Sequence, residues 1–167
     1  MKTDKDFLKV EEDILSGLDR LDALLDEYLE LTDPRKKAIK LANKKIAFVG
    51  SIGQNNTPNI KAMLVAKHDG LNTFYFASNN SAIRTEQFKT NDKACIYFYG
   101  KPIYKGLMLE GAMEVINDEN VKKMIWKNRM KSVYKNGRIN DHDFCVLKFI
   151  AKSGRYYSWF KTETFEV

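Results

Sequence analysis

The amino-terminal part of the chain carries apolar residues at helical spacing. Over residues 4–31 an apolar residue recurs every seventh position, at Phe7, Ile14, Leu21 and Tyr28, with acidic side chains around the rest of the turn. This spacing places the apolar residues along one stripe of an α-helix. The pattern therefore predicts a long helix that packs across the rest of the chain or across a partner subunit.

A second, shorter helix is predicted directly after the first. The segment Thr32-Asp33-Pro34 ends the first pattern, and proline is well accommodated in the first turn of a new helix. This second helix is expected to reach Leu41. We therefore expect residues 1–41 to form a helical extension and residues 42–167 to form a β-rich domain.

From Lys45 onward the apolar pattern changes to that of β-strands. Runs rich in valine, isoleucine, phenylalanine and tyrosine are separated by turn residues such as Asp69-Gly70, which is a strong hairpin signal. Residues 81–89 and 118–135 begin with serine or aspartate and are predicted helices. About six strands with two inserted helices exclude a parallel βαβ sheet and favour a mainly β fold, a small antiparallel barrel. The predicted strands cover residues 45–53, 59–70, 71–78, 94–100, 104–118 and 144–160.

Charge is distributed unevenly along the chain. The formal net charge is +6 over 167 residues, but residues 1–33 hold 4 basic and 11 acidic side chains, a net −7. Residues 34–167 hold 24 basic and 11 acidic side chains, a net +13. A body this basic is expected to prefer an anion. The apolar fraction of 44% excludes a disordered chain, and the length fits one domain with an appendage.

The most basic stretch lies between Lys122 and Lys135. With Trp126 and Tyr134 available for stacking on bases, this stretch could bind nucleic acid. Such a run is more often the solvated face of a helix, and here it could also meet the acidic arm. Nucleic acid is therefore the less favoured partner. The basic residues are Lys122, Lys123, Lys127, Arg129, Lys131 and Lys135.

The cysteines and histidines form no recognisable catalytic or metal site in the sequence. Cys95 and Cys145 each lie in an apolar run, as expected for buried reduced thiols. The Asp141-His-Asp143 spacing fits no strong metal site and is expected to be a solvated loop. No stretch approaches the roughly 18 apolar residues of a membrane span, and the first residues do not resemble a signal peptide. These features predict a cytoplasmic protein without a membrane partner.

The junction between the strand that ends near Ser78 and the next helix is a candidate anion site. Free N–H groups and the positive end of the helix dipole meet there. Ser78 and Ser81 add hydroxyl donors, and Arg84 adds a forked cation. The hairpin at Asp69-Gly70 would bring Lys61 close to Ser78. Taken alone, however, Ser81 could be only a helix cap, and Arg84 and Lys61 only surface charges.

Several short segments, taken in order, resemble one family. Residues 38–160 resemble the pyridoxamine-phosphate-oxidase-like flavin-binding split barrels, and among them the short bacterial general stress proteins that bind FMN. No single segment is specific, and the resemblance lies in their order and spacing. The segments are 57–63, 74–78, 81–84, 95–98, 109–118, the helix around Trp126, 141–148 and 156–159.

The resemblance implies a split β-barrel homodimer that shares each FMN site between two subunits. The family usually has arginine at the position of Lys61 and lysine at the position of Arg84. Both exchanges keep the charge and change the hydrogen-bonding geometry. The implied site residues are Lys61, Ser78, Ser81 and Arg84 for the phosphate, Ala62, Met63 and Leu64 for the flavin ring, and Glu110 and Trp159 from the partner subunit.

The resemblance also implies a flavin reductase or oxidase-like activity with a nicotinamide nucleotide or a small oxidant. The flavin would carry the redox chemistry, so no catalytic residue is expected among the side chains. A deazaflavin, FAD or haem is an alternative cofactor. A flavin carrier or sensor without turnover is an alternative function. The chain ends at Val167 without the arginine-rich segment by which true pyridoxamine-phosphate oxidases hold their substrate, so that reaction is not expected.

Overall fold

The computed structural model describes residues 16–17, 20, 33–100, 105–136 and 138–167. The long helix predicted over residues 4–31 lies outside these ranges, except for residues 16, 17 and 20, which are helical. The proposed division between a helical extension and a β-domain at residues 41 and 42 stays a prediction.

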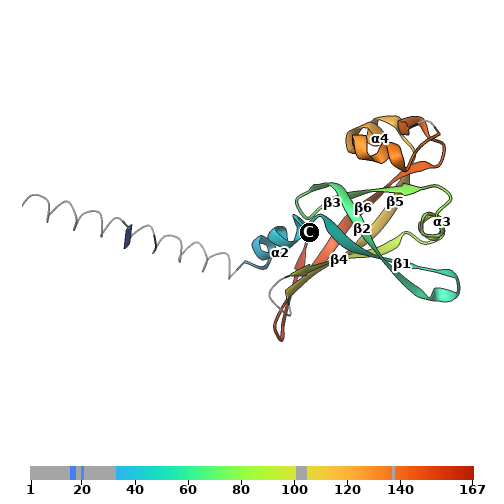
Figure 1. The fold of residues 1–167 in the computed structure, drawn as a ribbon. Coiled ribbons are helices and arrows are strands. Elements are labelled where there is room, and N and C mark those ends of the chain that lie inside the picture. Colours follow the sequence, from blue (N-terminus) through green and yellow to red (C-terminus); the bar gives the residue numbers. More distant parts are fainter. Residues whose placement is uncertain (1–15, 18–19, 21–32, 101–104, 137) are drawn as a thin grey trace, which may run out of the picture.

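Within the described residues, six antiparallel strands close into a barrel and a seventh strand extends it (Figure 1). The strand order is β3-β2-β1-β4-β5-β6-β7, and pairing between β3 and β6 closes the first six strands. The predicted mainly β fold, a split barrel, is confirmed. The strands are β1 (Ile46–Ile52), β2 (Pro58–Asp69), β3 (Thr73–Asn79), β4 (Lys93–Gly100), β5 (Lys105–Ile116), β6 (Phe144–Ser158) and β7 (Lys161–Glu166).

Alternating side chains on the strands build the main core inside the barrel. In β3 every second residue is buried, and Phe74 and Phe76 are fully enclosed with Phe98 and Phe149. This period of two is what a strand with one buried face requires. The predicted hairpin is confirmed, since β2 and β3 pair around a turn in which Gly70 has a φ of +53°, a conformation that favours glycine.

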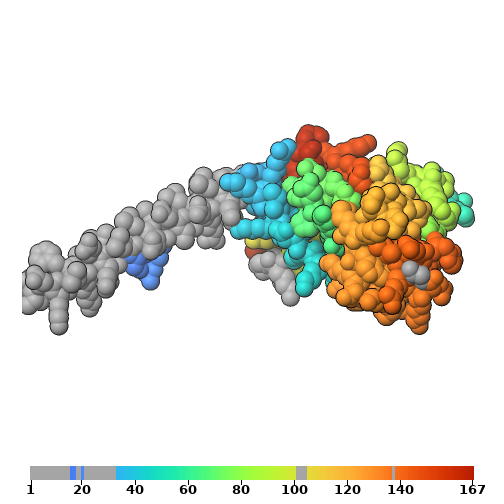
Figure 2. Space-filling model, turned by 90° about the horizontal axis from the view of Figure 1, so that it is seen from above, coloured from blue at the N-terminus to red at the C-terminus, as the bar shows by residue number. Residues whose placement is uncertain are grey.

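Helix α2 (Pro34–Ala42) closes one end of the barrel. Asp33 caps the helix by accepting a hydrogen bond from the N–H of Arg35 at 2.8 Å, and Pro34 occupies the first turn. Ala38 and Ala42 are fully buried against the barrel core. Both views place α2 at the opposite end of the molecule from α4 (Glu119–Ile125) (Figures 1 and 2).

A second, smaller core lies where α4 covers β3 and β6. Its buried members are Ile125, Tyr134, Phe144 and Val146. The rings of Tyr134 and Phe144 are 4.5 Å apart between centroids. Figure 2 shows the orange segment around α4 gathered on this side of the barrel. This second core holds the segment after β5 against the end of β3.

Two regions differ from the sequence prediction. The helix predicted over residues 118–135 stops at Ile125, because Trp126 is extended and its ring packs at 5.6 Å from that of Phe144. Two short 3-10 turns follow, Asn128–Ser132 and Arg138–Asn140. The strand predicted over residues 144–160 ends at Ser158, and the polar strand β7 follows it unpredicted.

Candidate functional site

Strand β2 leaves β3 halfway along its length, and this divergence opens one edge of β2. The two strands pair only from Val65 to Asp69 of β2, with a register shift between Val65 and Lys67. Residues 58–64 pair with β1 on one side, and no other described strand pairs with their opposite edge. We call this stretch, residues 58–64, the open edge. Its outward-facing backbone groups lack a strand partner and are suited to bind a ligand.

Arg84, in the first turn of α3 (Ile83–Thr90), contacts Met63 of the open edge. Its Nη1 lies 3.1 Å from Sδ of Met63, and the side chain is half-buried. Among the described residues no carboxylate forms an ion pair with Arg84. Burial lowers the pKa of Arg84, because desolvation disfavours the charged form. An anion bound beside Arg84 would offset this penalty.

Lys61 lies on the same side of β2 as Met63, because residues two apart in a strand point to one face. The lysine is exposed and, within the part of the chain that the structure describes, forms no ion pair. Its cross-strand partner is Val49 of β1, and the pairing with β3 ends before it reaches Ser78. Lys61 and Arg84 thus flank Met63 on one side of the open edge.

Ser78 is buried, with 5% of its surface exposed, and its hydroxyl faces the interior. The Oγ of Ser78 lies 3.2 Å from Oγ1 of Thr85, which donates to the carbonyl of Asn79 at 2.7 Å. The hydroxyl of Tyr134 donates to the carbonyl of Ser78 at 2.9 Å, and burial raises the pKa of Tyr134 to about 12. The hydroxyl of Ser78 is therefore committed to the packing between β3 and α3.

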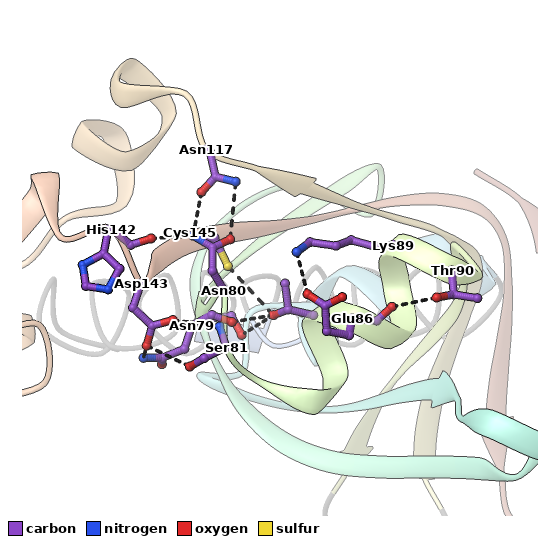
Figure 3. A network of polar contacts seen from close by, with 12 residues as sticks. Asn79, Asn80, Ser81, Glu86, Lys89, Thr90, Asn117, His142, Asp143 and Cys145 are labelled. Atoms are coloured by element: carbon purple, nitrogen blue, oxygen red, sulfur yellow. Dashed lines mark hydrogen bonds and ion pairs between the residues drawn. The ribbon is translucent and has the colours of Figure 1, made fainter.

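Ser81 is engaged by a carboxylate of the chain itself (Figure 3). Its N–H donates to Oδ1 of Asp143 at 2.7 Å, and its hydroxyl donates to Oδ2 at 3.0 Å. The side-chain amide of Asn79 donates to the same Oδ2 at 2.6 Å. These hydrogen bonds, that from Asn79 first, hold the pKa of Asp143 below its usual value. Ser81 is consequently not the cap of α3, which begins after Ala82 without a side-chain cap.

Glu110 and Trp159 lie in different places on the barrel. Glu110 accepts a hydrogen bond from Arg155 at 2.8 Å and lines an outer hollow of about 390 Å³ together with Ile60 and Cys95. Trp159 stands at the turn between β6 and β7, 63% exposed, with a φ of +55°. Their expected contacts from a partner subunit stay predictions.

A larger hollow of about 690 Å³ separates the β1–β2 connection from the outer face of α3. Amide side chains dominate its polar lining, including Gln54, Asn55, Asn56 and Gln87. Ser81 and Ile83, at the start of α3, also line this hollow, so it lies next to the candidate phosphate site.

The remaining reactive groups form no further site within the described residues. Cys145 is buried and Cys95 is partly buried; neither forms a disulfide, and burial raises the pKa of both thiols. No cluster of three metal-ligating side chains occurs among the residues that the structure describes. None of the described helices has the length and apolarity needed to cross a bilayer.

Known proteins resemble this arrangement along most of the chain. The family described as Pyridoxamine 5'-phosphate oxidase like matches residues 33–165. The chain belongs to this family. No curated protein matches the chain.

One solved structure of the family shares substantial sequence with the chain. It is a protein from Clostridium acetobutylicum, described as related to general stress protein 26 of Bacillus subtilis and assigned to the pyridoxinephosphate oxidase family. The two are 38% identical, with a TM-score of 0.73, over 81% of this chain and 96% of the other.

Two more distant structures share the fold alone. General stress protein 26 from Bacillus anthracis is 16% identical, with a TM-score of 0.65 over 83% of this chain and 99% of the other. A heme binding protein from Mycobacterium smegmatis is 12% identical, with a TM-score of 0.65 over 80% of this chain and 58% of the other.

Three residues of the site region were not singled out as site residues from the sequence. The sequence predicts a solvated loop around Asp143, offers Tyr134 only for stacking on nucleic-acid bases, and carries no signal for Thr85. All three contact the end of β3, and Asp143 and Tyr134 do so from distant parts of the chain. The polar Asn79-Asn80-Ser81 turn indicated that hydrogen-bond partners were needed, but not which residues would supply them.

Proposed function

We propose that the chain binds FMN along the open edge of β2, with the phosphate between Arg84 and Lys61. The observation that carries this proposal is the half-buried Arg84, which has no acidic partner among the described residues. A guanidinium in this state favours an anion with several acceptor oxygens. The family membership supports the same choice of ligand class.

The open edge suits the flavin ring for a separate reason. A flavin ring has hydrogen-bonding atoms along one side, and the backbone of Ala62 and Leu64 offers unpaired groups at this edge, while the backbone of Met63 between them faces β1. Ala62 and Leu64 are exposed, so the backbone there is accessible. The residues present thus fit the proposed cofactor. Ser78 and Ser81 would contribute through the shape of the turn rather than through their hydroxyls, which are already engaged.

We further propose that two copies of the chain form the complete site. Ile60, Leu64 and Phe48 are 75%, 56% and 41% exposed on neighbouring strands. They continue into an apolar hollow of about 560 Å³ lined also by Tyr97 and Tyr99. An exposed apolar surface of this kind marks an interaction site. A second copy seated here would cover the face and could bring Glu110 or Trp159 to the flavin.

The proposed activity is that of a flavin-dependent oxidoreductase in the cytoplasm that uses a nicotinamide nucleotide as donor. Bound FMN would supply the hydride and electron transfer, and the chain would bind, orient and shield it. Deazaflavin or FAD would need the same phosphate contacts. Haem is a second candidate cofactor, and the distant neighbour described as heme binding supports it at the level of the fold. The alternative functions are a flavin carrier or sensor without turnover and, less favoured, nucleic-acid binding by the basic stretch from Lys122 to Lys135.

The absorbance spectrum of the purified protein tests the cofactor. Flavin bands, or flavin bands after addition of FMN, are the expected result. A Soret band would indicate haem. A colourless protein whose thermal unfolding FMN does not shift would contradict the proposal. Rapid-mixing reduction by NADH or NADPH then separates an enzyme from a carrier, since the carrier would not be reduced by either donor.

Replacement of both Lys61 and Arg84 by alanine tests the phosphate contacts. The double variant should lose about 3–6 kcal/mol of FMN binding free energy, because two charge-assisted contacts are removed. Equilibrium titration of flavin fluorescence measures this change. Replacing Lys67 and Lys152, two exposed lysines elsewhere on the barrel, gives a control of equal charge. Equal affinity of the double variant and the wild type would contradict the proposed phosphate site.

A further inference from the structure

The turn between β3 and α3 is held by residues from both sides of α4, chiefly by the segment that follows it. The backbone N–H of Asn80 donates to the carbonyl of Asp143 at 2.6 Å. The side-chain amide of Asn80 donates to the carbonyl of His142 at 2.8 Å and to Oδ1 of Asn117 at 3.0 Å. The Asp143 carboxylate accepts the bonds from Asn79 and Ser81, so Asp143 contacts all three residues of the turn through its carboxylate and its backbone carbonyl (Figure 3).

We propose that Asp143 is a positioning residue for the phosphate site, which sets the turn at residues 79–81 and thereby places Arg84. This inference rests on the proposed FMN binding and adds how the site is held. Asp143 itself would not touch the cofactor. Its function would be to fix the backbone from which the phosphate-binding cation projects.

The connection from Asp143 to Arg84 is short. Ser81, which gives Asp143 two hydrogen bonds, precedes Arg84 by three residues, and α3 begins between them at Ile83. Since Ala82 gives α3 no side-chain cap, the conformation of the first turn depends on what fixes Ser81. Without the Asp143 carboxylate, Ser81 would lose both of these hydrogen bonds, and the turn that leads to Arg84 would be held less firmly, although Thr85 would still tie α3 to Ser78 and Asn79.

The carboxylate is suited to this role because it accepts three donors at once. A neutral amide could accept fewer hydrogen bonds, since one of its two polar atoms is a donor. The N–H of Asp143 donates to Oδ1 of Asp141 at 3.0 Å, and Asp141 is itself buried and accepts from Asn136. Asp143 is therefore fixed from its own backbone as well as from the turn.

The geometry also separates this role from that of a phosphate ligand. Ser81 donates its only hydroxyl proton to Asp143, so it has no hydroxyl donor left for a phosphate. If Asp143 instead competed with the phosphate for Ser81, its removal would strengthen FMN binding. If it positions Arg84, its removal weakens FMN binding. The two roles thus predict opposite signs.

The experiment compares FMN with riboflavin, which has the same ring and lacks the phosphate. The full-length Asp143→Ala protein should bind FMN about tenfold more weakly than wild type, with riboflavin affinity changed less than about twofold. The FMN affinity of Asp143→Asn should fall between those of wild type and Asp143→Ala, because the remaining oxygen of the asparagine can still accept the Ser81 N–H. Glu86→Gln, which removes an exposed negative charge from the same helix, is the control and should change neither affinity.

Three results would overturn the proposal. Equal weakening of FMN and riboflavin would indicate a purely structural role, unchanged FMN affinity would indicate no role, and tighter FMN binding would indicate competition. If Asp143→Ala does not fold, the isosteric Asp143→Asn gives the same comparison, and thermal unfolding of the unliganded proteins checks the fold. A wild-type protein that binds neither flavin would instead refute the proposed function, which keeps the two failures apart.

Discussion

Tyr134 shows how a single buried side chain links the second core to the candidate site. Its ring packs on Phe144, and its hydroxyl donates to the carbonyl of Ser78 at the end of β3. The pKa of Tyr134 is raised to about 12, mainly by burial and to a smaller extent by the nearby Cys145, Asp143 and Asp141. The folded state therefore favours the neutral phenol, which can donate this hydrogen bond.

Replacement of Tyr134 by phenylalanine should change how stability depends on alkaline pH. In the wild type, the stability from the neutral phenol is fully present below pH 10, the ordinary pKa of tyrosine, and is lost as pH rises toward about 12. At neutral pH the wild type should be more stable by about 1 kcal/mol, because of the hydrogen bond. By about pH 11 it should lose roughly 1 kcal/mol relative to the variant.

Urea unfolding of both proteins between about pH 8 and pH 11 measures this difference. Other titrating groups are common to the two proteins, so they cancel in the comparison. Parallel stability curves would contradict the raised pKa of Tyr134.

At the scale of elements, two irregularities in the strand pairing shape the barrel. The register of β2 against β3 shifts after Val65, which creates the open edge. The register of β5 against β6 shifts between Glu110 and Gly111. Opposite this shift, the other edge of β6 stops pairing with β3 and begins to pair with β7. Such β-bulges bend a strand and increase its twist. The split in the barrel thus coincides with irregular pairing at these two places.

Replacement of Gly111 by alanine should destabilise the protein by about 2–3 kcal/mol. A Cβ at this position would overlap the carbonyl of Ile150 and lie 3.0 Å from Cα of Ala151, and backbone cannot move away cheaply. Denaturant unfolding measures the change. Gly70→Asn is the control, because nothing lies near that position and asparagine tolerates its positive φ; it should cost less than about 1 kcal/mol. Equal stability of Gly111→Ala and wild type would show that the bulge can relax.

At the scale of the whole molecule, α2 and α4 pack on different parts of the barrel, each against its own core (Figure 1). Between them the outer surface of β1, β2 and β4 exposes Phe48, Ile60, Leu64 and Tyr99. Burying one such side chain contributes about 1.5–3 kcal/mol, so the burial of all four is enough to support association of two copies.

Replacement of Ile60 by glutamate should shift the protein toward monomer and weaken FMN binding with it. A charge introduced into a buried interface costs several kcal/mol, whereas in the monomer this position is 75% exposed and tolerates it. Val133→Glu, at 64% exposure on the α4 side, is the matched control and should leave the mass unchanged. Sedimentation velocity measures the oligomeric state of both variants, and titration of flavin fluorescence measures their FMN binding. A wild-type protein that is already monomeric, or an Ile60→Glu protein that remains dimeric, would contradict the proposed dimer.

The sequence by itself determined the local features of this protein. The change of period at Lys45, the glycine in the β2–β3 turn and the proline start of α2 each depend on neighbouring residues, and the structure confirms them. The charge and hydrogen-bonding types of Lys61 and Arg84 are likewise properties of the residues themselves.

Only the tertiary structure decided how these features combine. Ser81 and Asp143 are 62 residues apart in the chain, and nothing local to either residue indicates that they meet. The open edge is present because β2 and β3 stop pairing at Val65 and Phe76, whereas β3 pairs along its whole length with β6, a strand distant in sequence. Such pairings are set by the packing of the whole barrel. For this reason the residue types at the site could be predicted, while the engagement of the two serines and the role of Asp143 could not.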